Sequence, residues 1–305
     1  MRPAARTAIM QETNKCDICG CEELLNYSMG KEIIRLEELA PGNFKVTDKD
    51  YGRSVETVKC RDCGLVQPKY MLESRDIVKL YANVEDDSYL ATSDIRGNSN
   101  YRQVNKLINK FSKNRGSLLE IGAGSGGLLN TLKQEFGHIY GVEPNKKFCQ
   151  FARERYGLLL DNIGYEDISE NRKYDIILAL DVMEHSVSVR HFMDKVSQLL
   201  ADEGIAIVST PNKNSFAARL LGKKWWHIRP PHLYYLDDRS FKILMDAAGF
   251  EIKKRAFFYW TFPISYLTDC LQQLLFKKSY ISLDKLTFRI KLNTFDSWVY
   301  VICKK

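Results

Sequence analysis

A short apolar run followed by a cluster of glycines constrains the fold of this chain more than any other feature. Residues 117–121 are predicted to form a strand, Gly-Ala-Gly-Ser-Gly-Gly follows at 122–127, and a helix is predicted over 128–136. Glycines let the backbone approach a ligand closely, and a helix N-terminus favours a negatively charged group. A strand, a glycine loop and a helix in this order are typical of α/β folds that bind nucleotide-like cofactors.

The pattern continues along the chain. Short apolar runs alternate with amphipathic segments over residues 117–256, which indicates βα units around a parallel sheet. Further strands are predicted at 138–142, 157–162 (weak), 174–180, 204–209 and 250–256. Further helices are predicted at 146–156 and 187–200, with one more that begins at Asp237 or Asp238 and ends before Gly249.

The glycine loop alone leaves two cofactor classes open. Gly122, Gly124 and Gly127 satisfy the G-x-G-x-x-G pattern of dinucleotide enzymes. Glu143 stands about 20 residues after the loop, where an acidic side chain meets ribose hydroxyls. Glu120 lies two residues before the first glycine, and its carboxylate would repel a pyrophosphate but attract an ammonium group. This favours a cofactor with an amino-acid moiety over a nicotinamide or flavin dinucleotide.

Four segments, taken together, resemble class I S-adenosylmethionine-dependent methyltransferases, and within them the UbiG-like and methyltransferase-23-type enzymes. These segments are Leu-Glu-Ile-Gly-Ala-Gly-Ser-Gly-Gly at 119–127, Gly-Val-Glu-Pro at 141–144, Tyr-Asp-Ile-Ile-Leu-Ala-Leu-Asp-Val-Met-Glu-His at 174–185, and Gly-Phe at 249–250. The resemblance covers about residues 100–256. It implies a Rossmann-like α/β fold with a seven-stranded methyltransferase sheet, whose last, antiparallel strand is formed by 298–303.

The resemblance also implies a cofactor site. S-adenosylmethionine would be bound by Glu120, Gly122, Gly124, Gly126, Glu143, Glu166, Asp167, Asp181 and Val182. The glutamate and glycines before Glu143 would hold the methionine part, Glu143 the ribose, and residues 166–167 the adenine, with 181–182 beside the cofactor. For residues 166, 167, 181 and 182 a capping or packing role remains an equal alternative.

Two Cys-x-x-Cys pairs lie near the N-terminus. Cys16 with Cys19 and Cys60 with Cys63 are each followed by glycine, and four thiolates suit a tetrahedral zinc ion. Four protein ligands leave no open position, so the predicted Zn²⁺ is structural. Cys21 is read as a bystander that could replace a ligand. Reduced cysteines in a small β-domain, or a redox pair, are the alternatives.

These features predict the domain organisation. A zinc-ribbon-like β module is expected over 11–75, a helical connector over 76–115 and the methyltransferase domain over 116–305, with 257–293 as an insert or lid. A zinc ribbon ahead of such a domain resembles sugar methyltransferases of deoxysugar and polysaccharide pathways. Residues 1–10 lack the apolar stretch of a signal peptide, and Met10 is an alternative start. No apolar run is long enough to cross a membrane, so a cytoplasmic protein is expected.

The segment after the 204–209 strand is predicted to face the methyl acceptor. Residues 225–235 are rich in aromatic rings and histidines, which suits a sugar or aromatic acceptor. Arg229 could meet a phosphate or carboxylate. His232 is the leading general base because imidazole titrates near neutrality, with His227 and His185 as weaker candidates. A structural role for His232 is the competing reading.

The sequence therefore predicts a methyltransferase acting on a hydroxyl of a sugar, a glycan precursor or a related small metabolite, which could be nucleotide-linked. Residues 256–280 could form a peripheral membrane contact, although a buried strand with a covering helix is favoured there. One alternative is a zinc-ribbon protein that senses a nucleotide without catalysis. A nucleic-acid methyltransferase is not expected, because the net charge of +7 includes no compact basic block and the 174–180 strand is followed by Asp-Val-Met-Glu.

Overall fold

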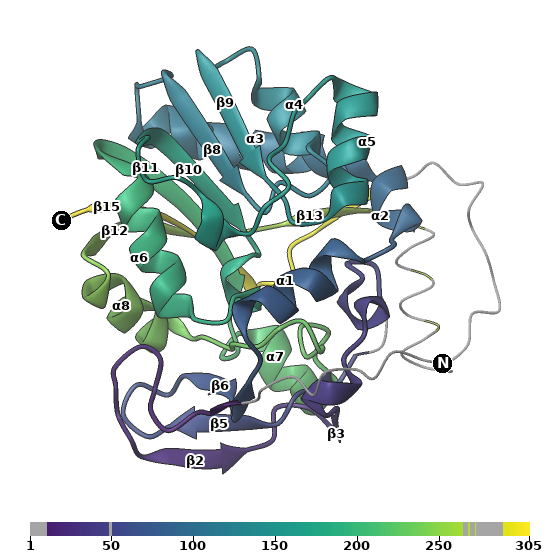
Figure 1. The fold of residues 1–305 in the computed structure, drawn as a ribbon, viewed down its shortest axis with the longest axis vertical. Coiled ribbons are helices and arrows are strands. Elements are labelled where there is room, and N and C mark those ends of the chain that lie inside the picture. Colours follow the sequence, from purple (N-terminus) through teal and green to yellow (C-terminus); the bar gives the residue numbers. More distant parts are fainter. Residues whose placement is uncertain (1–10, 49–50, 265–267, 269–271, 273–288) are drawn as a thin grey trace.

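The computed structural model describes residues 11–48, 51–264, 268, 272 and 289–305. Its centre is a six-stranded sheet in the order β12-β15-β11-β10-β8-β9 (Figure 1). The strands are β8 (Ser117–Ile121), β9 (His138–Val142), β10 (Tyr174–Leu180), β11 (Leu200–Pro211), β12 (Phe250–Phe257) and β15 (Ser297–Lys304). β9, β8, β10 and β11 pair in parallel, whereas β15 is antiparallel to both β11 and β12. The predicted Rossmann-like α/β class and its antiparallel last strand are confirmed.

The weak strand predicted at 157–162 differs from the expectation. Here the chain makes a single parallel bridge, between Asp161 and Val142. Directly afterwards the Asn162 amide donates to the carbonyl oxygens of Glu143 (3.0 Å) and Pro144 (2.8 Å). These side-chain bonds turn the chain before a ladder can extend, so the seventh strand is reduced to one bridge.

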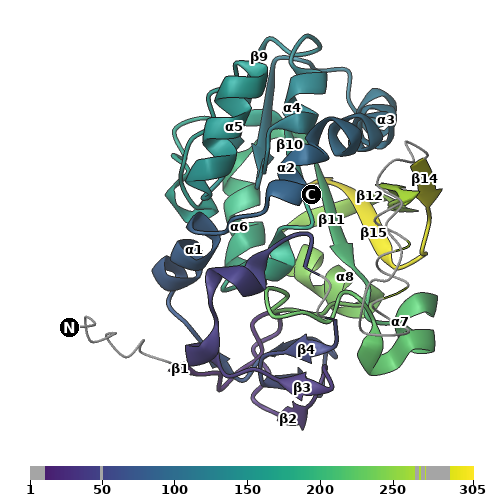
Figure 2. The ribbon, with the colours of Figure 1, turned by 90° about the vertical axis from the view of Figure 1, so that its right-hand side faces the viewer.

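Helices cover both faces of the sheet (Figures 1 and 2). One layer holds α3 (Ser93–Phe111), α4 (Gly127–Leu132) and α5 (Lys146–Tyr156), and the other holds α6 (Val189–Leu199) and α8 (Asp238–Ala247). Successive side chains of β10 alternate between them: Ile176 and Leu178 pack with the α3–α4 side, Ile177 and Ala179 with the α6–α8 side. Burial on both faces explains why these strands read as continuous apolar runs.

Helix limits follow local signals in most places. α5 coincides with its prediction and ends at Gly157, whose φ of 67° is left-handed. α8 begins after Asp237, which accepts a hydrogen bond from the backbone N–H of Ser240. α4 ends at Leu132, earlier than expected. A short helix, α7 (Phe216–Leu221), is followed by the 3-10 turn η5 (Gly222–Lys224). Residues 225–235 come next, and we call them the aromatic segment.

Residues 11–71 form small sheets at the bottom of Figure 1. The main one is antiparallel and the others have two strands each. Their members are β2 (Leu24–Tyr27), β5 (Thr57–Cys60) and β6 (Val66–Pro68); β3 (Glu32–Ile33) with β4 (Arg53–Ser54); and β1 (Gln11–Glu12) with β7 (Tyr70–Met71). Two 3-10 turns, η1 (Leu36–Glu38) and η2 (Pro41–Phe44), lie between β3 and β4. We call residues 11–71 the N-terminal module.

The N-terminal module is docked onto the large sheet's helices and loops. The half-buried Asp17 accepts hydrogen bonds from Ser188 Oγ (2.7 Å) and from the backbone N–H of Arg190 (3.1 Å) at the start of α6. Val66 and Tyr235 exchange backbone hydrogen bonds, of 2.9 and 3.3 Å. Buried residues of the module and of α6 and α8 belong to one apolar cluster. The module therefore shares a core with α6 and α8 of the large sheet's helical layer.

Two regions complete the description. α1 (Ser74–Ala82) and α2 (Asp87–Ala91) lead from the module to α3. β13 (Trp260–Pro263) pairs with β14 (Arg289–Leu292), but most of the predicted 257–293 insert and of the 256–280 membrane contact lies outside the described residues. Within the described part of the chain, no helix combines the length and the apolarity needed to span a bilayer.

Asp17→Asn is expected to lower the free energy of unfolding by about 1–3 kcal/mol, because the amide would turn an N–H₂ group toward one of the two donors that the carboxylate now satisfies. Urea denaturation measures this loss. Asp62→Asn, an exposed position in the same module, is the matched control and should change stability by less than about 0.5 kcal/mol. Equal effects of the two substitutions would contradict the docking role of Asp17.

Candidate functional site

A cavity of about 570 Å³ lies at the carboxyl ends of β8, β9 and β10. Such an edge of a parallel sheet is where α/β proteins bind ligands. α1, α2, α3 and the segment after β11 also line the cavity, and the N-terminal module contributes a further wall with Phe44, Lys45, Val46 and Tyr51.

The glycine loop is shaped by close contacts at one side of the cavity. Gly122 and Gly124 have φ of 71° and 54°. A Cβ atom at Gly124 would lie 2.2 Å from the Tyr89 hydroxyl oxygen, and one at Gly122 would lie 2.6 Å from a methyl group of Val182. Glycine is therefore required at both positions, because the backbone is left-handed there and because a side chain would have no room. Gly126, with φ of 75°, packs against α5 and does not line the cavity.

Glu120 is buried beside this loop. Its Oε2 atom has no hydrogen-bond partner among the described residues. Burial, followed by the charge of Glu143, raises the pKa of Glu120 to about 8. A buried carboxylate oxygen without a partner is costly, and a cationic ligand would remove that cost.

Glu143 is held in place by the glycine loop. Its two carboxylate oxygens accept from the backbone N–H groups of Gly124 (2.8 Å) and Asn145 (2.9 Å). Burial raises the pKa of Glu143 to about 7, although these two hydrogen bonds oppose the shift. Each oxygen retains a second lone pair, so the carboxylate is oriented but still able to accept from ribose hydroxyls.

The remaining predicted cofactor residues are divided. Glu166, in the 3-10 turn η3 (Tyr165–Asp167), lines the cavity and accepts a hydrogen bond from Ser74, whereas Asp167 is exposed and outside the lining. Asp181 and Val182 line the cavity directly after β10. Asp181 has φ of 52° and accepts from Ser209 Oγ at 2.7 Å. Burial raises its pKa to about 6.

Several lining residues were missed by the sequence reading. Tyr89 stacks on Phe148 with ring centroids 5.1 Å apart, and the Arg96 guanidinium lies 4.7 Å from the Tyr89 ring. Asn100 contributes an Oδ1 atom that is buried and lacks a partner in the described structure. All of these except Phe148 come from the predicted helical connector, whose amphipathic pattern indicated helices but not that their polar side faces a cavity.

The aromatic segment after β11 supplies the other side of the cavity. Its lining residues are Trp226, His227, Arg229, Pro231 and His232. The His232 ring stands edge-on to His185, at 4.7 Å and 88°, and stacks with His227 at 5.6 Å and 24°.

Other members of this segment are structural. Trp225 is fully buried and donates to Asp296 at 2.9 Å, and Tyr234 donates to the Val187 carbonyl oxygen at 2.8 Å. Arg229, expected to meet an acceptor's anionic group, donates instead to the carbonyl oxygens of Lys45 and Val46. It ties the aromatic segment to the N-terminal module.

The three histidines are held neutral. Burial lowers the pKa of His185 and of His227 to about 4 and that of His232 well below its ordinary value. Nδ1 of His232 is buried without a partner in the described residues. His227 Nε2 lies 3.5 Å from a carboxylate oxygen of Asp296, a partner that sequence spacing did not indicate.

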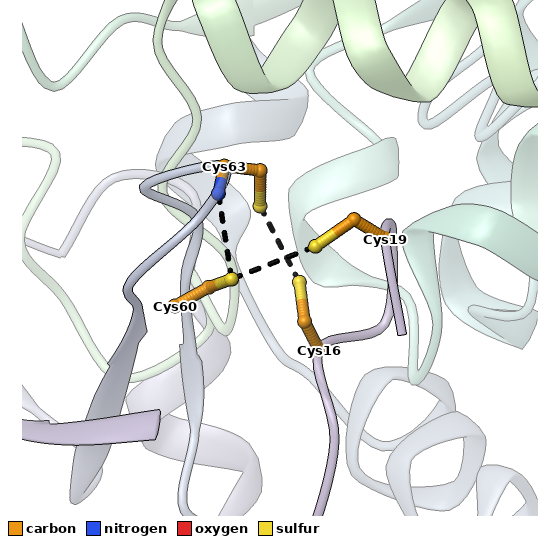
Figure 3. A group of neighbouring side chains, drawn as sticks. All are labelled: Cys16, Cys19, Cys60 and Cys63. Carbon is orange, nitrogen blue, oxygen red and sulfur yellow. Dashed lines mark hydrogen bonds between the residues drawn. The ribbon is translucent and has the colours of Figure 1, made fainter. Parts of the chain in front are cut away.

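The four predicted zinc ligands converge in the N-terminal module (Figure 3). The sulfurs of Cys16 and Cys63 are 3.4 Å apart, those of Cys19 and Cys60 are 3.6 Å apart, and all four lie within 4.8 Å of one another. Zn–S bonds of about 2.3 Å in a tetrahedron give sulfur separations of about 3.8 Å, so the cluster fits zinc. Cys21 lies outside it.

The architecture and the cavity define an α/β protein with the class I methyltransferase fold. A chain from the complex of the Haloferax volcanii Trm112 methyltransferase activator with a methyltransferase superposes with a TM-score of 0.50, covering 72% of this chain and 96% of that chain at 11% identity. This likeness concerns the fold alone.

Sequence comparison then gives the family. A family described as a methyltransferase domain matches residues 96–254, so the chain belongs to this family of S-adenosylmethionine-dependent methyltransferases. Ubiquinone biosynthesis O-methyltransferases from Bradyrhizobium diazoefficiens and Azorhizobium caulinodans are each 30% identical to it, over 158 and 152 residues. The matched part covers 45% and 46% of this chain but only 62% and 60% of those relatives.

The cavity fits the family's cofactor. The partnerless oxygen of Glu120 suits the ammonium group of S-adenosylmethionine, the Gly122–Gly124 backbone leaves room beside it, and Glu143 can accept from the ribose. The predicted recognition and cofactor are confirmed at the level of the family.

Cys60→Ser is expected to remove one equivalent of zinc and to lower stability by several kcal/mol, since structural zinc binding contributes directly to folding and the module shares the core of α6 and α8. Metal analysis and thermal melting measure both effects. Cys21→Ser should change neither. Unchanged zinc content in the Cys60 variant would refute the assigned ligand set.

Glu120→Gln is expected to stabilise the cofactor-free protein above pH 8 while abolishing S-adenosylmethionine binding. The folded-state pKa of about 8 exceeds the ordinary value of 4.5, so the native state binds more protons between these values and loses stability as pH rises. Removing the titration should gain up to a few kcal/mol at pH 9 and little at pH 4. Melting scans against pH test this, with the exposed Glu203→Gln as control. A variant less stable than the parent at pH 9 would contradict it.

Proposed function

We propose that this chain transfers a methyl group from S-adenosylmethionine to an oxygen of a small-molecule acceptor bound beside His232. The observation that carries the proposal is one cavity with two chemically different sides. A glycine loop and partnerless Glu120 form one side, and neutral histidines with aromatic rings form the other. The cofactor supplies a methyl group on a positively charged sulfur, so the protein's task is alignment and proton removal.

On the donor side, we assign Glu120 and the Gly122–Gly124 backbone to the amino-acid part and Glu143 to the ribose. Glu166 would border the adenine, while Asp181 and Val182 would lie beside the cofactor after β10. The exposure of Asp167 and the packing of Gly126 against α5 favour structural roles for these two positions.

On the acceptor side, a hydroxyl must lose its proton as its oxygen forms the new bond to the methyl carbon and the carbon–sulfur bond breaks. His232 is neutral and buried, and its Nδ1 atom has no partner among the described residues. The low pKa makes it a weak base on its own. His227, held near Asp296, is the second candidate for the proton.

The class of acceptor rests on the lining. Phe44, Tyr51 and Trp226 place aromatic rings around the acceptor side, and such rings stack on sugars and on aromatic rings alike. The hydroxyl of a sugar, a glycan precursor or a nucleotide-linked sugar remains our first candidate. An aromatic hydroxyl is the second, supported by the names of the ubiquinone O-methyltransferase relatives.

The residues that line the cavity give less support to two alternative functions. A nucleotide sensor without catalysis would not need the histidine cluster next to the cofactor side. A nucleic-acid methyltransferase would need an open basic surface, whereas the N-terminal module walls this cavity and the Arg229 guanidinium is engaged by backbone carbonyls.

We expect calorimetric titration to give binding of S-adenosylmethionine but not of NADH, and mass spectrometry to find one methyl group on an acceptor from a panel of sugars, nucleotide sugars and phenols. Gly124→Ala should abolish cofactor binding, because the added Cβ would overlap the Tyr89 hydroxyl. Gly157→Ala, at a left-handed position with nothing near its Cβ, controls for loss of glycine alone. Tight NADH binding, or cofactor binding retained in Gly124→Ala, would overturn the assignment.

A further inference from the structure

Three cationic side chains line the acceptor side of the cavity. Lys45 directly follows η2 in the N-terminal module, Lys224 ends η5, and Arg229 belongs to the aromatic segment. None of the three has a carboxylate partner within the part of the chain that the structure describes. A further lining cation, Arg96, stacks on Tyr89 beside the glycine loop. The carboxylates that line the cavity are the ones we assign to the cofactor side: Glu120, Glu143, Glu166 and Asp181.

Backbone contacts bring the segments that carry these three cations together. The Arg229 guanidinium donates to the Lys45 carbonyl oxygen. A Cβ atom on Gly52, in the same module as Lys45, would lie 2.7 Å from the Lys223 carbonyl oxygen, so the module also touches the turn that ends at Lys224. The N-terminal module therefore contacts both of the segments that carry the other two cations.

The stretch that carries Lys45 is also fixed from the side of α2. The backbone N–H and the hydroxyl of Thr47 donate to the two carboxylate oxygens of Asp86, at 2.9 and 2.6 Å. Asp86 is buried and caps α2 by accepting from the backbone N–H of Tyr89 at 3.0 Å. The Lys45 backbone is thus held between Asp86 and Arg229, and the cationic group is positioned before a ligand arrives.

The charge of Arg229 is not neutralised by its neighbours. Its terminal N–H groups donate to carbonyl oxygens, which satisfy hydrogen bonds but carry no net charge, and its Nε atom is buried without a partner in the described structure. Glu184 is fully buried outside the cavity lining, and burial raises its pKa well above the ordinary value, so it stays protonated. Asp296, also outside the lining, accepts from Trp225 and Thr294. A half-buried charge without a counter-ion is costly, and an anionic ligand would remove that cost.

The charge of Arg229 reaches the rings around the acceptor. Burial is the main cause that lowers the pKa of His185, His227 and His232, and the Arg229 charge adds to this effect at each ring. An anion bound beside Arg229 would therefore offset a charge that these rings already experience.

We propose that Lys45, Lys224 and the charge of Arg229 bind a phosphate or diphosphate group of the methyl acceptor. Lysine binds phosphate as a point charge, and a group with two or more negative charges offsets three cations better than the single charge of a carboxylate. The acceptor would place its phosphate toward the N-terminal module and its hydroxyl toward the histidines. This role toward the acceptor rests on the proposed methyltransferase function, whereas the anion site itself does not.

The site would also affect proton removal. A phosphate that offsets the Arg229 charge would raise the pKa of the histidines. Whichever of them receives the hydroxyl proton would then be a stronger base in the acceptor complex than in the free protein. An acceptor without the phosphate would lose both its anchor and this effect.

Calorimetric titration of the full, zinc-loaded chain with inorganic pyrophosphate tests the site apart from catalysis. We expect binding that weakens as the salt concentration rises. Lys45→Gln and Lys224→Gln should each weaken it by about two- to fivefold, as for a partly exposed ion pair, and the double variant should weaken it further. Lys223→Gln removes the same charge from an adjacent, exposed position outside the lining, and it should retain binding.

Absence of pyrophosphate binding, undiminished binding in the double variant, or equal losses in Lys223→Gln and Lys224→Gln would overturn the site. With acceptors, a phosphorylated sugar or a nucleotide sugar should have a lower KM than the same sugar without phosphate. Lys45→Gln and Lys224→Gln should raise that KM and leave kcat within about twofold, because a contact remote from the reacting atoms contributes mainly to binding.

Two further outcomes separate this inference from the proposed function. Equal use of the neutral sugar, or preference for a phenol with a carboxylate over every phosphorylated acceptor, would overturn the phosphate assignment and leave methyl transfer standing. Pyrophosphate binding that depends on Lys45 and Lys224, without methyl transfer to any acceptor, would support the anion site and count against the proposed function.

Discussion

Burial of carboxylates at the carboxyl edge of the sheet is the constraint around which this molecule is organised. Glu120, Glu143 and Glu184 are buried and Asp181 is half-buried, all close to the ends of β8, β9 and β10, and burial raises the pKa of every one of them. Such an edge is stable only where backbone N–H groups, hydroxyls or bound cations offset the desolvation. The glycine loop supplies backbone N–H groups, and Ser209 and Thr210 of β11 supply the hydroxyls.

The hydrogen-bond donors to these four carboxylates are distributed unevenly. Glu143 has two backbone donors and Asp181 has Ser209, whereas Glu120 and Glu184 each keep one oxygen without a donor among the described residues. At Glu120, the ammonium group of a bound cofactor would offset the burial of this oxygen. Glu120 faces the cofactor side, and Glu184 lies with the histidines on the acceptor side.

Local patterns were sufficient for most of the fold. Alternating apolar runs predicted the sheet, and Asp237 and Gly249 bounded α8 as expected. The strand at 157–162 failed because the Asn162 side chain competes for the backbone, an interaction that periodicity does not report. At the site, Glu120, Gly122 and Glu143 could be predicted from the sequence because each lies in the glycine-loop motif or at a fixed spacing from it. Tyr89 and Asp296 could not be predicted, because their contacts with Gly124 and His227 join segments far apart in the sequence.

Arg229 shows why the N-terminal module belongs to the site's architecture. In the sequence it stands among aromatic rings and histidines, where a guanidinium suggests an anionic ligand. In the fold it donates to the carbonyl oxygens of Lys45 and Val46, while the backbone N–H of Gly52 donates to Ile228 at 2.8 Å. The aromatic segment is thus held by contacts from the N-terminal module. These contacts come from the part of the chain between Cys19 and Cys60, which belong to the thiolate cluster. Zinc at Cys16, Cys19, Cys60 and Cys63 would close this part of the chain into a loop, and it would thereby help to hold the segment that carries His232, although none of these cysteines lines the cavity.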